Sequence, residues 1–235
     1  MSEAKTSPRL SVVVPAYNEE RTLETIVKRV LALPLSLEVL VVNDGSKDKT
    51  AEIVAELARS DARVRGFHLA RNSGKGAAVR RGISEACGDY VVIQDGDLEY
   101  DPHDFEPMLA EMERSGLLCL YGSRRLRYRS AHAQASYYWG GVVITWFTNL
   151  LYRSKLTDEP TCYKMWKREL VQSLQLQCDG FEFCPEVTAK VLKRGIAIPE
   201  IQIKYEPRTA KEGKKIKWRD GIIALWTLLK YRFKT

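Results

Sequence analysis

The chain has 235 residues, of which 45% are hydrophobic and 29% are charged, a balance that favours a folded protein with a substantial core and excludes a low-complexity chain. Its five cysteines are odd in number and include no C-x-x-C pair, so the sequence predicts neither a disulfide framework nor a zinc site. This cysteine usage favours a reducing, cytoplasmic compartment, and the first ten residues lack the apolar core of a signal peptide.

The net charge of +7 is unevenly distributed along the chain. Residues 1–120 hold 15 Lys and Arg against 20 Asp and Glu, a net of −5, whereas residues 121–235 hold 22 against 10, a net of +12. A basic second half beside an acidic first half indicates an anionic partner for the second half. Nucleic acid, phospholipid and phosphorylated ligands all meet this requirement.

Apolar strands alternate with helical stretches through the first half of the chain. The sequence predicts strands over residues 11–16, 37–44, 64–70, 89–95 and 117–123. A helix follows the first strand, with Leu23, Ile26, Val27, Val30 and Leu31 on one face, and further helices are predicted over residues 47–58, 76–87 and 102–114. This alternation predicts an α/β fold with a mainly parallel central sheet flanked by helices.

Polar runs follow four of the predicted strands: PAYNEE, NDGSKDKT, RNSGKG and QDGD. In parallel sheets of this kind, ligands collect at the carboxyl ends of the strands. The four runs are therefore expected to meet at one edge of the sheet. Asp44, at the end of the second predicted strand, is suited to accept hydrogen bonds from a nucleobase or ribose.

The run QDGD places two carboxylates, Asp95 and Asp97, one residue apart at a strand end. Carboxylate oxygens suit the hard cations Mg²⁺ and Mn²⁺, which often bind through few carboxylates together with substrate phosphates. Gly96 between them permits close approach of the backbone to a ligand. The spacing therefore favours a metal site, against the alternative of an acidic surface loop.

The run RNSGKGAAVRRG opens a predicted helix with a glycine-rich turn, whose free backbone N–H groups suit a phosphate. It is not a Walker A loop, because Leu69 stands where the first glycine is required and Gly76 where Ser or Thr is required. The sequence thus disfavours an ATPase of that kind. An ordinary strand-to-helix turn is the alternative.

Two segments of the second half are apolar and aromatic. Residues 135–152 approach the length of a membrane-spanning helix, but Tyr138, Thr145, Asn149 and Tyr152 fall near one polar stripe, which favours a buried or interfacial helix. In the tail, Trp218, Ile222, Leu225, Leu229 and Phe233 recur at helical spacing with basic residues at the end. That pattern favours a helix lying on an anionic membrane surface, and a core-packing helix with a solvated basic end is the alternative.

The motifs VVVPAYNEE, VVNDGSKDKT, RNSGKGAAVRRG, QDGDLEYDP and YGSR occur in this order and spacing. Together they make the chain resemble inverting family 2 glycosyltransferases with the GT-A fold, closest to the polyprenyl- and dolichyl-phosphate sugar (mannose) synthases. The resemblance extends to about residue 205. It implies a single catalytic domain over residues 1–235, with a Rossmann-like nucleotide-sugar-binding half over residues 1–122 and an acceptor-binding, basic, membrane-facing half over residues 123–235.

The resemblance also implies roles for individual residues. The nucleotide sugar would contact Pro15, Tyr17, Glu19, Asp44, Lys75, Asp95, Gly96 and Asp97. A divalent metal, Mg²⁺ or Mn²⁺, would bind Asp95, Asp97 and Glu99, although the related group usually has Gln at the last position. Catalytic roles would fall to Asp97, Arg124 and Asp158, and the acceptor phosphate would contact Arg124, Arg125, Arg208 and Lys214. Cys162 departs from the family, which usually has glycine there.

The implied reaction is transfer of a hexose from a nucleotide sugar, of the GDP-mannose or UDP-glucose type, to a polyprenyl or dolichyl phosphate. A phosphate monoester is largely ionised near neutrality, with a second pKa of about 6, and needs no strong base. The first alternative is transfer to a glycan or glycolipid hydroxyl, with Asp158 or Glu159 as base. The second is a nucleic-acid-binding protein that uses the basic half, but no recognised nucleic-acid module is present. We therefore expect a peripheral enzyme on the cytoplasmic face of a membrane, without a nucleic-acid partner.

Overall fold

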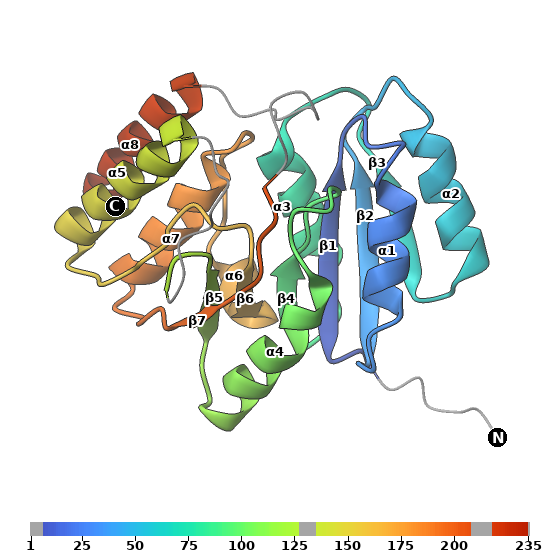
Figure 1. Ribbon diagram of the computed structural model, residues 1–235, viewed down its shortest axis with the longest axis horizontal. Helices are drawn as coiled ribbons and strands as arrows, with labels where there is room; N and C mark the ends of the chain where they lie inside the picture. The colour runs from blue at the N-terminus through green and yellow to red at the C-terminus, as the bar shows by residue number, and fades with distance from the viewer. Residues whose placement is uncertain (1–6, 127–134, 208–217, 235) are drawn as a thin grey trace.

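Figure 1 shows the computed structural model of the chain, which describes residues 7–126, 135–207 and 218–234. A seven-stranded sheet lies at its centre, in the order β3-β2-β1-β4-β6-β5-β7. Strand β6 runs antiparallel to its neighbours β4 and β5, and the other pairings are parallel. The predicted α/β architecture, with a mainly parallel sheet flanked by helices, is confirmed.

The first half of the chain alternates strands and helices as expected. Its elements are β1 (Leu10–Ala16), α1 (Leu23–Leu31), β2 (Leu37–Asn43), α2 (Thr50–Ser60), β3 (Val64–His68), α3 (Lys75–Glu85), β4 (Tyr90–Ile93), the short 3-10 helix η1 (Pro102–Asp104), α4 (Phe105–Arg114) and β5 (Cys119–Ser123). Helix α2 begins three residues later than predicted, because the Asp48 carboxylate accepts the Thr50 backbone N–H in the turn before it.

The second half adds two strands to the same sheet. Its elements are α5 (Ala135–Tyr152), β6 (Lys164–Lys167), α6 (Arg168–Ser173), α7 (Phe183–Lys193), β7 (Glu200–Gln202) and α8 (Trp218–Phe233). The expected boundary between residues 122 and 123 falls inside β5. Strands from both sides of that boundary therefore share one set of backbone hydrogen bonds.

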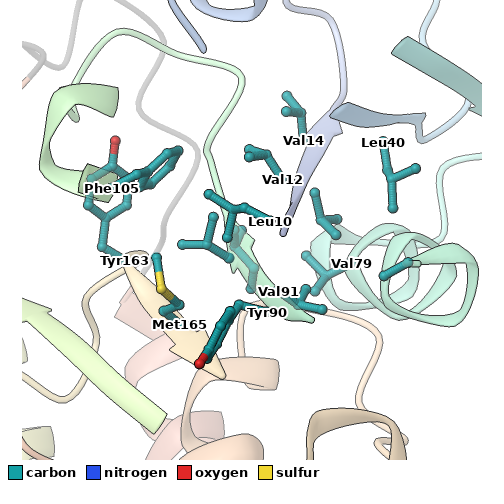
Figure 2. Close-up of a cluster of buried hydrophobic side chains, with 14 of the residues drawn as sticks. Leu10, Val12, Val14, Leu40, Val79, Tyr90, Val91, Phe105, Tyr163 and Met165 are labelled. Atoms are coloured by element: carbon teal, nitrogen blue, oxygen red, sulfur yellow. The ribbon is translucent and has the colours of Figure 1, made fainter. Parts of the chain in front are cut away.

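The core is built on β1, whose residues from Leu10 to Val14 are completely buried. Figure 2 shows Leu10, Val12 and Val14 of this strand among side chains from the neighbouring strands and from helices on either side. A central parallel strand is covered on both faces, which explains why its sequence is continuously apolar rather than alternating. This rigid centre fixes the strand ends from which the polar loops emerge.

Helices α5 and α8 lie side by side at the end of the molecule farthest from β3 (Figure 1). The Tyr152 hydroxyl of α5 donates to the Leu228 carbonyl of α8 at 2.7 Å, and both helices pack against α7. Within the described ranges, no helix is long and apolar enough to cross a membrane.

Candidate active site

Loops from the carboxyl ends of β1, β2 and β4 meet at one edge of the sheet, because these strands are parallel. The loop after β2 lies directly on the loop after β3. Gly45 has a φ of +64°, and a Cβ there would lie 2.5 Å from the Arg71 carbonyl carbon. Only glycine fits such a close approach at positive φ. The expected convergence of polar runs is therefore found.

Asp44 is buried beneath these loops and holds the start of α3 in place. Its two carboxylate oxygens accept the backbone N–H groups of Ser73 at 2.7 Å and Gly74 at 2.8 Å. Burial raises the pKa of Asp44, and the two hydrogen bonds oppose that rise. A carboxylate has about four acceptor positions, so Asp44 retains capacity for a nucleoside while it orders the glycine-rich turn.

The loop that follows β1 packs against the Asp95–Asp97 loop, and Gly96 lies at the point of closest approach. A Cβ at Gly96 would lie 3.3 Å from the Pro15 carbonyl oxygen and 3.4 Å from Glu19 Cγ. The Thr22 hydroxyl lies 2.9 Å from both the Gly96 carbonyl oxygen and Glu19 Oε2. Pro15, Glu19 and Gly96, predicted separately from two motifs, thus lie close together. Tyr17 stands in the same loop and is half-buried.

Lys75 reaches from the start of α3 to the same loop. Its Nζ lies 2.5 Å from Asp95 Oδ1 and 3.8 Å from Cys162 Sγ. Burial alone would lower the pKa of Lys75, but attraction to Asp95 outweighs it and raises that pKa well above the ordinary value. Lys75 is therefore a fixed positive charge beside one of the two predicted metal-binding carboxylates.

Asp97 and Glu99 follow on the same loop. Asp97 is 9% exposed, and its Oδ1 accepts the Glu99 backbone N–H at 3.0 Å. Glu99 Oε2 accepts the Tyr205 hydroxyl at 2.7 Å. In the part of the chain that the structure describes, no three carboxylate, His or Cys side chains form a ready-made metal cage. Two carboxylates are nonetheless a fitting set for Mg²⁺ or Mn²⁺, which complete their shells with waters and substrate phosphates.

Beside this loop, Arg124 and Arg125 both bind the buried carboxylate of Asp158. Arg124 binds Asp158 in a two-pronged ion pair, with Nε to Oδ2 at 2.6 Å and Nη2 to Oδ1 at 2.8 Å. Arg125 Nη2 shares Asp158 Oδ1 at 2.8 Å. Burial would raise the pKa of Asp158, but the charges and hydrogen bonds of the two arginines outweigh it and lower that pKa to about 2. Asp158 is therefore ionised by virtue of the two arginines, although it is fully buried, and both of its oxygens are already hydrogen-bonded.

Tyr205 joins the acidic loop to the arginine pair. Its hydroxyl bonds Glu99, and the Arg124 guanidinium lies over its ring, 5.0 Å from the centroid. The predicted metal side and the predicted acceptor side therefore form one continuous site. Sequence reasoning missed Tyr205, because its partners are far away in the chain and no local motif marks it.

Two further residues support the arginine pair and were also missed. The Glu200 carboxylate accepts the Thr157 and Asp158 backbone N–H groups at 2.7 and 3.0 Å. Thr145 of α5 accepts from Arg125 and from the Glu159 backbone. Thr145 did fall on the polar stripe expected in α5, which was the only signal for it. Arg208 and Lys214, predicted to bind the acceptor phosphate, lie outside the described residues.

Comparison with known protein families matches residues 11–174 to the family described as Glycosyl transferase family 2. Among curated proteins, the chain is 30% identical over 215 residues to the glycosyltransferase AglD of Haloferax volcanii, covering 85% of this chain and 33% of AglD. It is 31% identical over 195 residues to the dodecaprenyl-phosphate galacturonate synthase of Rhizobium johnstonii, covering 79% of this chain and 56% of the synthase. The chain thus spans about a third of the first relative and just over half of the second.

Solved structures share the fold at low sequence identity. The glucosyl-3-phosphoglycerate synthase of Mycobacterium tuberculosis, in complex with Mn²⁺, UDP and glucosyl-3-phosphoglycerate, superposes with a TM-score of 0.70 at 19% identity. The alignment covers 95% of this chain and 80% of that one. S. aureus TarS in complex with UDP-GlcNAc gives a TM-score of 0.64 at 15% identity, with 95% and 66% covered. These likenesses confirm the expected GT-A fold.

Proposed function

The chain belongs to glycosyl transferase family 2, as its motifs indicated, and from that premise we propose that it transfers a hexose from a nucleotide sugar to a polyprenyl phosphate at a membrane surface. The observation that carries this proposal is the continuity of the site. Tyr205 touches both the acidic loop, through Glu99, and the arginine pair, through Arg124. A diphosphate donor and an anionic acceptor require such neighbouring sites.

The donor side is assigned to the three loops around Gly96. Pro15, Tyr17, Glu19 and Asp44 line the nucleoside, and Lys75 lies beside the diphosphate. The close approach of Gly96 to Pro15 and Glu19, linked through the Thr22 hydroxyl, supports this assignment, because it brings two separate motifs together. The expected donors are of the GDP-mannose or UDP-glucose type.

Asp95 and Asp97 are the residues that would hold Mg²⁺ or Mn²⁺, with Glu99 adjacent. When bound, such a metal supplies Lewis-acid stabilisation of the charge that develops on the leaving diphosphate. Structural neighbours crystallised with Mn²⁺ or Mg²⁺ and UDP support the use of a divalent metal. Lys75 would share in neutralising the diphosphate, and its short contact with Asp95 keeps it at that position before the donor arrives.

The acceptor phosphate is assigned to Arg124 and Arg125, with Arg208 and Lys214 as further cations. Asp158 fixes the planes of the two guanidinium groups, and such charge-assisted hydrogen bonds are strong and directional. We assign Asp158 a positioning role rather than that of a base. A carboxyl group with a pKa of about 2 and both oxygens engaged is a poor proton acceptor at neutral pH.

This electrostatic arrangement favours a phosphate over a hydroxyl acceptor. Glu159, the other candidate base, is also completely buried, and its Oε1 accepts the Thr188 hydroxyl at 2.9 Å. An ionised phosphate oxygen attacks the anomeric carbon without losing a proton to the protein, whereas a hydroxyl needs a base within reach. The name of the Rhizobium johnstonii relative, a dodecaprenyl-phosphate galacturonate synthase, is consistent with this choice.

The membrane side is assigned to the outward faces of α5 and α8. Trp139 and Trp146 of α5 are each 61% exposed, and Trp226 of α8 is 64% exposed. Monomeric soluble proteins rarely expose so much clustered aromatic surface without a partner. The same two helices and the residues just after them carry exposed cations: Arg153, Lys155, Arg219, Lys230, Arg232 and Lys234. Tryptophan at the interface and cations facing lipid phosphates suit a peripheral helix pair.

The test is donor turnover with Mn²⁺ or Mg²⁺, screening GDP- and UDP-sugars with and without a short polyprenyl phosphate, and comparing the protein with Asp97→Ala. Metal-dependent transfer to the lipid phosphate, lost in the variant, is the expected result and identifies the donor. Donor hydrolysis that ignores the lipid phosphate would favour the hydroxyl acceptor. Absence of donor binding would contradict the proposal.

A further inference from the structure

Helix α5 is apolar on two sides, because Ile144, Phe147 and Leu151 pack inward against α7 and α8 while a second apolar stripe faces away from the protein. Its apolar residues at positions 139, 143, 146 and 150 recur at intervals of four, three and four, and each is between 48% and 61% exposed. Thr145 and Thr148 are buried on the opposite side. The outward stripe has the form of a lipid-contacting face. The inward side must therefore have polar partners within the protein.

Thr145 finds those partners at the arginine pair. Its hydroxyl donates to the Gly141 carbonyl of its own helix at 2.8 Å. The same oxygen accepts the Glu159 backbone N–H at 3.0 Å and Arg125 Nη2 at 3.1 Å. A hydroxyl has one donor and two acceptor positions, so Thr145 uses its full capacity. Two of its three bonds leave the helix, and both end at the segments that hold Asp158.

Thr148 provides an internal comparison on the same helix. It is completely buried, and its hydroxyl donates to the Ile144 carbonyl at 2.9 Å within α5. No hydrogen bond from the Thr148 hydroxyl to another described element is present. The two threonines thus share residue type, helix and burial, and differ in whether they bond the arginine site.

We propose that Thr145 couples the position of α5 to the arginine pair, so that contact of the outward face of α5 with a membrane sets the orientation of Arg125 and Asp158 toward the acceptor phosphate. This inference rests on the proposed function for the identity of the acceptor. It makes Thr145 a positioning residue, since it reaches the phosphate only through Arg125 and the Glu159 backbone. The physical basis is the short reach of a hydrogen bond, which weakens steeply when its geometry is disturbed.

The first experiment measures coupling without requiring sugar transfer. Hydrogen–deuterium exchange at the Glu159 amide is followed before and after addition of phosphatidylcholine–phosphatidylglycerol vesicles. In the unaltered protein, and in Thr148→Val, vesicles should slow this exchange. In Thr145→Val the amide should exchange faster and no longer respond to vesicles, while Thr145→Ser, which keeps the hydroxyl, should restore the response. If Thr145→Val does not fold, two other variants still test the inference. Vesicles should slow exchange of the Glu159 amide in Thr145→Ser and should have no effect on it in Trp146→Gln.

The second experiment measures kcat and KM for a polyprenyl phosphate in vesicles. Thr145→Val should lower kcat by about tenfold, the loss expected when hydrogen bonds to a charged group and a buried amide are removed. Donor affinity and vesicle affinity should be unchanged, and Thr148→Val should stay within about twofold of the unaltered protein because it removes only a bond within the helix.

Three results would overturn the inference: Glu159 exchange that ignores vesicles in the unaltered protein, equal effects of Thr145→Val and Thr148→Val, or absence of vesicle binding. If no polyprenyl phosphate accepts sugar while the Glu159 amide behaves as expected, the proposed function fails and the coupling stands. The two failures are therefore distinguishable.

Discussion

Helices α1 and α5 differ in how much apolar surface they leave exposed. In α1, Leu23, Ile26, Val27 and Val30 are completely buried against the sheet. In α5, Trp139 and Trp146 are 61% exposed, while Thr145 and Thr148 are buried. The donor half therefore obeys the usual rule that the apolar side of a helix faces the core. Helix α5 departs from this rule, because it carries an exposed apolar stripe in addition to the apolar side chains of Ile144, Phe147 and Leu151 that face the protein.

The largest expected effect tests the donor half. Asp97→Asn should lower metal-dependent sugar transfer by about 1,000-fold, because an amide replaces a carboxylate that would hold the metal on the leaving diphosphate. Steady-state transfer assays with labelled donor measure it. The matched control is Asp89→Asn. Asp89 directly precedes the first residue of β4, at the end of the strand away from Asp97, and its half-exposed side chain pairs with Arg9. Comparable losses in the two variants would show that Asp97 has no special role.

The next effect concerns the buried arginine pair. Asp158→Asn should lower the free energy of unfolding by about 3 kcal/mol, because it leaves two partly buried guanidinium groups without their counter-charge. Urea unfolding at neutral pH measures it. If Asp158→Asn and Asp89→Asn lower the free energy of unfolding by the same amount within error, this account of Asp158 is contradicted.

The same pair predicts a dependence of stability on pH. The pKa of Asp158 is about 2 in the folded protein and lies near 4 in an unfolded chain. Its stabilising contribution is therefore fully present above pH about 4 and is lost as the pH falls toward 2. The stability difference between the protein and Asp158→Asn should be constant from neutral pH down to about 5 and narrow below about 4. A difference that already narrows at neutral pH would contradict the assigned pKa.

The third effect tests the exposed apolar surface of α5 and α8 directly. Trp146→Gln and Trp226→Gln should each weaken binding to anionic vesicles by about tenfold, because each removes a large apolar side chain from the interface. Vesicle co-sedimentation measures it. Leu118→Gln is the control, since Leu118 is exposed but lies just before β5, outside both helices, and should leave vesicle binding unchanged. Equal losses in all three variants would mean that the surface of α5 and α8 is not the contact.

The smallest effect separates the apolar from the ionic part of that contact. Raising the salt concentration should weaken vesicle binding only about threefold, because exposed cations are screened while the tryptophans are not. If salt weakens vesicle binding as much as the tryptophan substitutions do, the contact with the vesicle is chiefly electrostatic.

The secondary structure of the first half could be predicted well from the sequence because local rules apply there. The strands and helices up to residue 123 follow from alternation, and the site loops follow from motifs at strand ends. The sequence missed β6, where Lys164 is completely buried with its Nζ 4.1 Å from the centre of the Tyr121 ring. A lysine normally marks a surface. It also missed Tyr205, which bonds Glu99 across 106 residues of chain, a contact that no local pattern encodes.

The most direct test of the central claim compares two acceptors that differ by one phosphate. The protein is supplied with its preferred nucleotide sugar, Mn²⁺, and vesicles that contain either a polyprenyl phosphate or the matching polyprenol, and the lipid product is measured. The account predicts sugar on the polyprenyl phosphate and none on the polyprenol, because the arginine pair is assigned to the phosphate and the two candidate bases for a hydroxyl, Asp158 and Glu159, are completely buried. Equal transfer to the polyprenol would contradict it.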